Sequence, residues 1–97
     1  MDIQKLFSLE GRVALVTGGS KNLGKHIARG FLAQGAKVYI SSRKADQCDA
    51  TAAELGPNCI ALPQDVSTVE GCRAVAAKIA ERDSRLDILV NNAGIIR

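Results

Sequence analysis

Aromatic side chains are scarce in this 97-residue sequence, which has no tryptophan and only Phe7, Phe31 and Tyr39. Proteins that bind single-stranded nucleic acids stack bases on several aromatic side chains placed among basic ones. The excess of positive charge is also small, at +3. We therefore expect no nucleic-acid partner, and a small anionic ligand accounts for the basic residues better than a polyanion does.

Long apolar runs are missing as well. No stretch reaches the roughly 20 apolar residues of a membrane-spanning helix, and residues 1–10 hold no apolar core of a secretion signal. The three cysteines, Cys48, Cys59 and Cys72, are odd in number and have no C-x-x-C spacing, which argues against a disulfide framework or a metal site. We expect buried, reduced thiols in a cytoplasmic protein that does not contact a membrane.

Internal repeats, low-complexity tracts and linkers are absent too, so residues 1–97 are expected to form one small domain. Apolar residues make up 46% of the chain and charged residues 24%, proportions that are ordinary for a globular protein. A chain of this length can bury one modest hydrophobic core.

The segment 12–24 carries the strongest local pattern. The apolar run Val13–Val16 predicts a strand over about 12–17 that is buried on both faces. Gly18 and the residue after it turn the chain. From Leu23 the apolar residues follow helical spacing through Ile27 and Phe31, which predicts a helix over about 22–34. This order brings the free N–H groups and the positive end of a helix to the end of a strand, an arrangement that suits a phosphate group.

Two motifs compete for the glycine turn. Residues 19–25 match G-x-x-x-x-G-K, the start of a P-loop, but His26 stands where the P-loop needs the hydroxyl that holds magnesium. Residues 17–24 match T-G-x-x-x-G-x-G except that Asn22 replaces the middle glycine, a mild change because asparagine tolerates the left-handed region. A tight strand–helix connection without any ligand is a third interpretation, which the turn alone leaves open.

The rest of the chain continues to alternate strands and helices. Strands are predicted over about 38–40, 59–62 and 86–90, and a helix over about 45–55 ends at Gly56. Ser67 followed by Glu70 reads as a capping box that starts a last helix. The apolar residues expected to line these two helices are Cys48, Ala52 and Leu55 in the first and Val69, Cys72, Ala76 and Ile79 in the second.

Four buried strands that alternate with three helices predict an α/β fold with a parallel sheet and right-handed crossovers. We expect the Rossmann-type strand order 3-2-1-4, the first half of a doubly wound domain, with two helices on one face of the sheet and the third on the other. Parallel strands end at a common edge, which would gather Gly18, Arg43, Asp65 and Asn91 beside the point where the strand order reverses.

Ser42 and Arg43 occupy the position, about 20 residues beyond the glycine turn, where an acidic residue would hold an adenosine ribose. No acid stands there, and Lys21 is available from the turn. Two cations facing a ribose suit a 2′-phosphate, which favours NADP(H) over NAD(H). Both basic side chains could instead be solvated surface charges.

The polar residues after the third and fourth strands also have two interpretations. Asp65 can accept a hydrogen bond from an adenine amino group, or it can be a loop residue ahead of the last helix. Asn91 and Asn92 can be turn formers, while Ala93 and Gly94 would let a ribose or nicotinamide approach the main chain closely.

Together these segments resemble the amino-terminal part of the short-chain dehydrogenase/reductase family. The likeness lies in Val-Ala-Leu-Val-Thr-Gly-Gly over residues 13–19, Ser-Ser-Arg over 41–43, Asp-Val over 65–66 and Leu-Asp-Ile-Leu-Val-Asn-Asn-Ala-Gly over 86–94. Among family members, the sequence is most similar to reductases of 3-oxoacyl thioesters and of sugar acids. The resemblance implies hydride transfer between NADP(H) and a carbonyl or alcohol substrate, in a protein that is a homo-oligomer at full length.

The resemblance also implies a role for each matching residue. It assigns the phosphates to Gly18, Ser20, Lys21, Asn22, Leu23 and Gly24, the 2′-phosphate to Ser42 and Arg43, the adenine to Asp65 and Val66, and the inner ribose to Asn91, Ala93 and Gly94. The family's catalytic Ser, its Tyr-x-x-x-Lys pair and its catalytic Asn have no counterpart within these 97 residues, so we expect the chain alone to be inactive. A stand-alone dinucleotide-binding module without catalysis and a P-loop-like nucleotide hydrolase are the alternatives.

Overall fold

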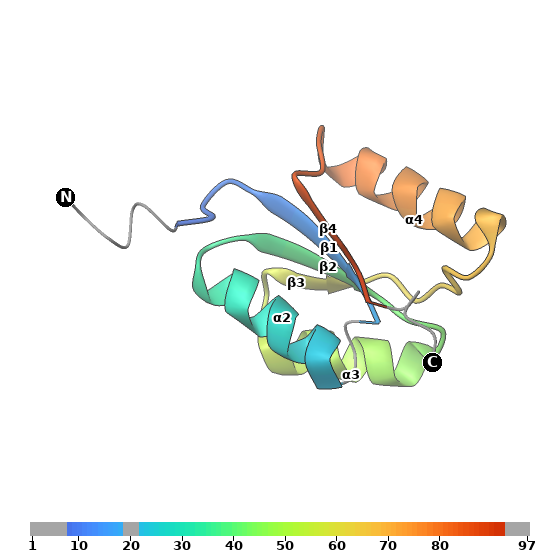
Figure 1. Ribbon diagram of the computed structural model, residues 1–97, viewed down its shortest axis with the longest axis horizontal. Coiled ribbons are helices and arrows are strands. Elements are labelled where there is room, and N and C mark those ends of the chain that lie inside the picture. Colours follow the sequence, from blue (N-terminus) through green and yellow to red (C-terminus); the bar gives the residue numbers. More distant parts are fainter. Residues whose placement is uncertain (1–7, 19–21, 93–97) are drawn as a thin grey trace.

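A four-stranded parallel sheet with helices on both faces is formed by residues 8–18 and 22–92, the part of the chain that the computed structural model describes (Figure 1). Its strands are β1 (Val13–Thr17), β2 (Lys37–Ser41), β3 (Cys59–Ala61) and β4 (Ile88–Asn91). They lie in the order β3-β2-β1-β4, and every neighbouring pair is parallel. The predicted Rossmann-type α/β fold and its strand order are therefore confirmed.

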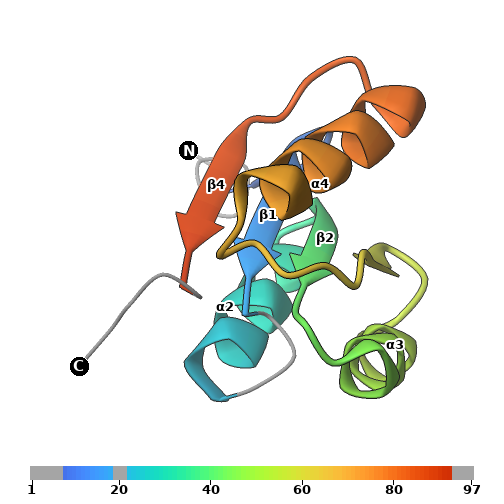
Figure 2. The same ribbon diagram turned by 90° about the vertical axis from the view of Figure 1, so that its right-hand side faces the viewer.

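The helices are α2 (Asn22–Ala33), α3 (Ala45–Leu55) and α4 (Val69–Arg82). Helices α2 and α3 cover one face of the sheet, and α4 lies on the other face (Figures 1 and 2). The chain steps from β1 to β3 in one direction across the sheet and then returns to β4 in the opposite direction. Because each crossover is right-handed, the return puts its helix on the opposite face, as predicted.

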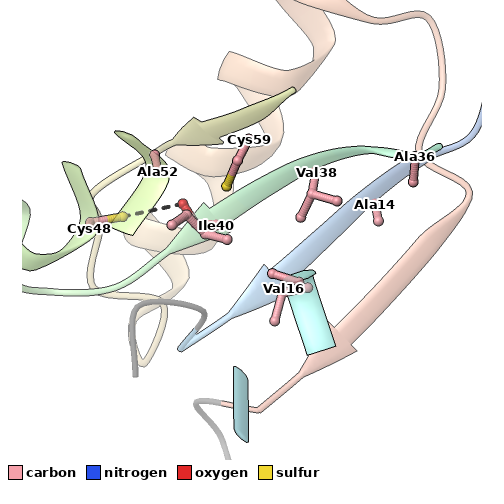
Figure 3. Close-up of a cluster of buried hydrophobic side chains, with 9 residues drawn as sticks. Ala14, Val16, Ala36, Val38, Ile40, Cys48, Ala52 and Cys59 are labelled. Carbon is pink, nitrogen blue, oxygen red and sulfur yellow. Dashed lines mark hydrogen bonds between the residues drawn. The ribbon is translucent and has the colours of Figure 1, made fainter. Parts of the chain in front are cut away.

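The face under α2 and α3 holds the larger buried cluster. Side chains of β1 and β2 that point to this face, such as Val16 and Ile40, are fully buried and pack against helix residues (Figure 3). Cys48 belongs to α3 and lies against β2, where its thiol donates to the carbonyl oxygen of Ile40 at 3.4 Å. Cys59 of β3 belongs to the same cluster. Burial raises the pKa of the Cys59 thiol to about 11, so both cysteines act here as small apolar residues.

The face under α4 is lined by the alternate residues of the same strands. Leu15 and Tyr39 lie here together with Val75 and Ile79 of α4. The two central strands are thus buried on both faces, which explains why their sequences are continuous apolar runs without polar alternation. Tyr39 is fully buried, and its hydroxyl donates to the carboxylate of Asp83, the residue that ends α4.

The start of α4 differs from the prediction. Thr68 is the N-cap, because its hydroxyl accepts a hydrogen bond from the N–H of Gly71 at 3.0 Å. The prediction of a capping box with Ser67 as the N-cap was therefore wrong, and the true N-cap is the next residue. Two adjacent hydroxyls are equivalent local candidates for this role, and the Ser67 hydroxyl is engaged by Asp65 instead, at 2.6 Å.

The predicted buried face of α4 was right for Ile79 and wrong for its other three residues. Its buried residues are Gly71, Val75 and Ile79, whereas Val69, Cys72 and Ala76 of the predicted stripe are exposed. A β-carbon at Gly71 would stand 1.8 Å from the carbonyl oxygen of residue 65. The helix therefore turns its glycine toward that loop, whereas Cys72 and Ala76 beside it line an open cavity between α4 and β4.

Three further predictions need correction at the surface. Cys72 is an exposed free thiol and not a buried one. Strand β4 begins at Ile88, so Leu86 lies before the strand and is exposed. Leu23 stands on the helical stripe of α2 but is 60% exposed, because it lies in the first turn, at the edge of the packed face.

Candidate functional site

The loops that follow β1, β2 and β3 are hydrogen-bonded to one another at the carboxyl edge of the sheet. The N–H of Gly18 donates to the carbonyl of Ser41 at 2.7 Å, and the N–H of Gln64 donates to the carbonyl of Ser42 at 2.9 Å. Strand β4 ends at the same edge (Figure 2). The structure thus places the residues that follow all four strands on one side of the molecule, at the edge where ligands of parallel α/β sheets bind.

The glycine turn brings the start of α2 against the end of β1. Gly18 has a φ of +69°, a conformation that favours glycine. A β-carbon on Gly24 would lie 2.2 Å from the carbonyl oxygen of Gly18, so only glycine fits at residue 24 in this arrangement. The first turn of α2 contains no acidic residue. No carboxylate of the first turn itself therefore neutralises the positive end of the helix dipole.

Three of the predicted phosphate-binding residues are described incompletely or not at all. Ser20 and Lys21 lie outside the described residues, and of Asn22 only its place as the first residue of α2 is described. Leu23 follows it with its side chain exposed.

The end of β2 presents a cation and no acid. Arg43 is exposed, and no ion pair joins it to another residue within the described ranges. Its positive charge contributes to the lowered pKa of Asp65, so the two charges influence each other across the edge. A guanidinium in this setting is available to bind an anion.

Asp65 is held by Ser67, a contact that the sequence analysis missed. One carboxylate oxygen, Oδ1, accepts both the N–H of Ser67 at 3.0 Å and its hydroxyl at 2.6 Å. These hydrogen bonds, the hydroxyl first, lower the pKa of Asp65 below its ordinary value. The residue is therefore a charged acceptor. The Asp-x-Ser spacing is the sequence signal that could have revealed this Asx turn.

Asn91 is tied to the neighbouring strand. The hydroxyl of Thr17 donates to Oδ1 of Asn91 at 3.1 Å and lies 3.3 Å from the carbonyl oxygen of Val90. Thr17 and Asn91 are register partners in the β1–β4 pair. This contact depends on strand register, so no local sequence pattern indicated a role for Thr17. The predicted ribose residues Ala93 and Gly94 lie outside the described residues.

Two further features lie close to this edge. The hydroxyl of Ser41 is buried and has no hydrogen-bond partner among the described residues, although such groups are normally satisfied. A cavity of about 410 Å³ lies between α4 and β4. Apolar side chains such as Leu15, Val75 and Leu89 form most of its lining, and Thr17 and Asn91 lie at its end near the carboxyl edge of the sheet. The chemistry of the glycine turn at the start of α2, of the exposed guanidinium of Arg43 and of the charged carboxylate of Asp65 fits the phosphates, the 2′-phosphate and the base of a dinucleotide.

Metal and membrane features are not seen in this part of the chain. Across residues 8–18 and 22–92, no three potential metal ligands gather into a group. None of the helices in those ranges combines the length and apolarity that crossing a membrane requires.

Comparison with known proteins connects this geometry to one family. A family model described as "short chain dehydrogenase" matches residues 12–97. A 3-oxoacyl-(acyl-carrier-protein) reductase of rhamnolipid biosynthesis from Pseudomonas aeruginosa is 51% identical over 90 residues, which are 91% of this chain and 35% of the reductase.

Two solved structures are similar as well. The Pseudomonas aeruginosa RhlG/NADP active-site complex matches with a TM-score of 0.86 and 50% identity, over 92% of this chain and 37% of that one. The 2-keto-3-deoxy-D-gluconate dehydrogenase of Streptococcus agalactiae matches with a TM-score of 0.85 and 37% identity, over 99% of this chain and 38% of that one. The chain thus spans little more than a third of the length of these relatives.

Proposed function

Because this chain belongs to the short-chain dehydrogenase family, we propose that residues 1–97 form the NADP(H)-binding unit of an oxidoreductase that acts on a carbonyl or alcohol. When bound, NADP(H) would supply or accept the hydride. The substrate class is supported by the names of two relatives, a reductase of a 3-oxoacyl group and a dehydrogenase of a keto sugar acid. A relative solved as an NADP complex supports the cofactor.

The observation that carries this proposal is the close approach of Gly24 to Gly18, since a β-carbon on residue 24 would lie only 2.2 Å from the carbonyl oxygen of Gly18. It presses the start of α2 against the end of β1, so the free N–H groups of the helix face the edge of the sheet. Arg43 lies along the same edge at the end of β2, where no acid stands. A phosphate-binding turn beside a cation that forms no ion pair within residues 8–18 and 22–92 suits a dinucleotide that carries an additional phosphate.

Each predicted site residue has a part in this proposal. We assign the phosphates to Gly18, Ser20, Lys21, Asn22, Leu23 and Gly24, the 2′-phosphate to Ser42 and Arg43, the adenine to Asp65 and Val66, and the inner ribose to Asn91, Ala93 and Gly94. Thr17 orients Asn91 through its hydroxyl.

Replacement of Arg43 by alanine tests the cofactor preference. Loss of a charge-assisted contact to the 2′-phosphate should weaken NADPH binding by about 1.5–3 kcal/mol, which is more than tenfold in Kd, and leave NADH binding nearly unchanged. Titrations of both nucleotides into the purified protein measure this. Arg73→Ala is the matched control, because it removes an equal charge from the exposed surface of α4. Equal losses for NADPH and NADH would contradict the assignment.

Two assays separate the other functions that the sequence left open. Carbonyl-dependent loss of NADPH absorbance by the full-length protein would distinguish an enzyme from a binding module. Phosphate release from ATP with magnesium would indicate the P-loop function instead.

The cellular setting is part of the same proposal. Free thiols at Cys48, Cys59 and Cys72 fit a cytoplasmic protein, and family resemblance suggests a homo-oligomer at full length. Localisation of a tagged full-length protein and its sedimentation would test these two points.

A further inference from the structure

Asp65 is immobilised at its main chain and at its side chain by different residues. The hydroxyl of Thr68 lies 3.2 Å from the carbonyl oxygen of Asp65, within hydrogen-bonding distance. Gly71 packs directly beneath that carbonyl, where a β-carbon would stand 1.8 Å from the oxygen. The first turn of α4 therefore determines where the main chain of residue 65 lies, and the orientation of the carboxylate is left to Ser67.

Ser67 engages only one of the two carboxylate oxygens. Its N–H and its hydroxyl both reach Oδ1 of Asp65, at 3.0 Å and 2.6 Å. No residue in the described ranges donates a hydrogen bond to Oδ2. Two donors on one oxygen orient the carboxylate group, and they leave the other oxygen as an acceptor.

The surroundings keep this acceptor charged and beside the rest of the edge. Hydrogen bonds from Ser67, together with the positive charge of Arg43, hold the pKa of Asp65 below its ordinary value. The next residue, Val66, packs against the cluster under α4, and its carbonyl accepts from the thiol of Cys72 at 3.2 Å. A base bound at this edge would therefore meet a rigid acceptor and would not have to order a mobile one.

We propose that Ser67 is a positioning residue that sets base specificity: by occupying Oδ1 of Asp65, it presents Oδ2 to the exocyclic amino group of adenine. The inference rests on the proposed binding of NADP(H) at this edge. Through this contact, Ser67 would make the site prefer a base that carries an amino group over a base that carries a carbonyl at the same position. A carbonyl oxygen facing Oδ2 would place two acceptors against each other.

The test compares NADPH with deamino-NADPH, in which a carbonyl replaces the 6-amino group of adenine and the phosphates are unchanged. Dissociation constants of both nucleotides are measured by titration of the purified protein. We expect the parent protein to bind NADPH at least about tenfold more tightly than the deamino analogue, the worth of one hydrogen bond to a charged group. Ser67→Ala should reduce this ratio to about twofold, and Ser67→Thr, which retains the hydroxyl, should restore it.

Three further variants show whether Ser67 acts through Asp65. Ser84→Ala is the matched control, because it removes an exposed hydroxyl after α4 and should leave the ratio unchanged. Asp65→Asn should abolish the preference for NADPH, and Ser67→Ala added to it should have no further effect, because the two residues act as one unit.

The outcomes separate the inference from the proposed function. NADPH binding with an unchanged ratio in Ser67→Ala would overturn the inference and leave the proposed function intact. Equal weakening of both nucleotides in Ser67→Ala would also overturn it, because that result describes a structural role. Failure of the parent protein to bind either nucleotide would overturn both.

Discussion

Replacement of Tyr39 by phenylalanine would measure how α4 is held on the sheet. The ring of Tyr39 is fully buried under α4, and its hydroxyl donates to the carboxylate of Asp83. Asp83 also pairs with the ammonium of Lys37 at 3.0 Å, and its N–H donates to the carbonyl of Ile79 at 2.8 Å to close the last turn of α4. The three side chains therefore join the start and middle of β2 to the end of the helix.

The expected magnitude follows from what the substitution removes. Phenylalanine keeps the volume of the ring, so the loss is one hydrogen bond to a charged acceptor, worth about 1.5–3 kcal/mol. Asp83 retains Lys37 after the change, so we expect the free energy of unfolding to fall by an amount near the lower end of that range. Asp83→Ala should cost more, because it leaves the buried hydroxyl of Tyr39 without an acceptor.

The same contact predicts how the effect depends on pH. The hydroxyl of Tyr39, followed by Lys37, lowers the pKa of Asp83 below its ordinary value of 3.8. A carboxylate with a lowered folded-state pKa stabilises the protein above its unfolded pKa, and that stabilisation is lost as pH falls through the folded value. The difference between Tyr39→Phe and the parent protein should therefore be largest near neutral pH and should shrink in acid.

Urea unfolding at neutral and acidic pH measures both effects. Lys37→Met is the matched control: it keeps the contact between Tyr39 and Asp83, and because the Lys37 side chain is 36% exposed it should cost less than Tyr39→Phe. An unchanged unfolding midpoint for Tyr39→Phe, a smaller effect for Asp83→Ala, or a deficit that persists in acid would refute the reasoning.

Two other predictions concern the edges of the sheet. Gly24→Ala should abolish NADPH binding in titrations because its β-carbon would lie 2.2 Å from the carbonyl oxygen of Gly18, whereas Gly30→Ala on the same helix, with nothing within 4 Å, should bind normally. Asp87 accepts from the N–H of Val13 at 2.9 Å, and this contact chiefly lowers its pKa. The stabilisation by Asp87 should therefore be lost as pH falls through its folded-state pKa. We expect the thermal unfolding temperature of Asp87→Asn to vary less between neutral and acidic pH than that of the parent protein. An equal pH dependence of the unfolding temperature in both proteins would be the contrary result.

Much of the fold could be predicted because several local patterns agreed. Continuous apolar runs identified β1 and β2, which are buried on both faces, and Gly56 marked the end of a helix with a positive φ of 113°. The same pattern wrongly predicted a buried β4, whose Leu89 is 62% exposed. The alternation of strands and helices, together with the general rule of right-handed crossovers, predicted the strand order 3-2-1-4. The structure confirmed this order. The position proposed for the site rests on the same argument, since the carboxyl ends of parallel strands must share an edge.

Only the tertiary structure decided which of several similar residues makes a given contact. Ser67 and Thr68 are alike as caps, and the loop geometry assigns Thr68 to the helix and Ser67 to Asp65. The sequence of α4 carries two adjacent apolar stripes, and the close approach of Gly71 to the loop at residue 65 selects the one that is buried. Thr17 meets Asn91 only through the register of β1 and β4. Local patterns repeat along one element, whereas contacts between elements depend on distances that the folded chain alone establishes.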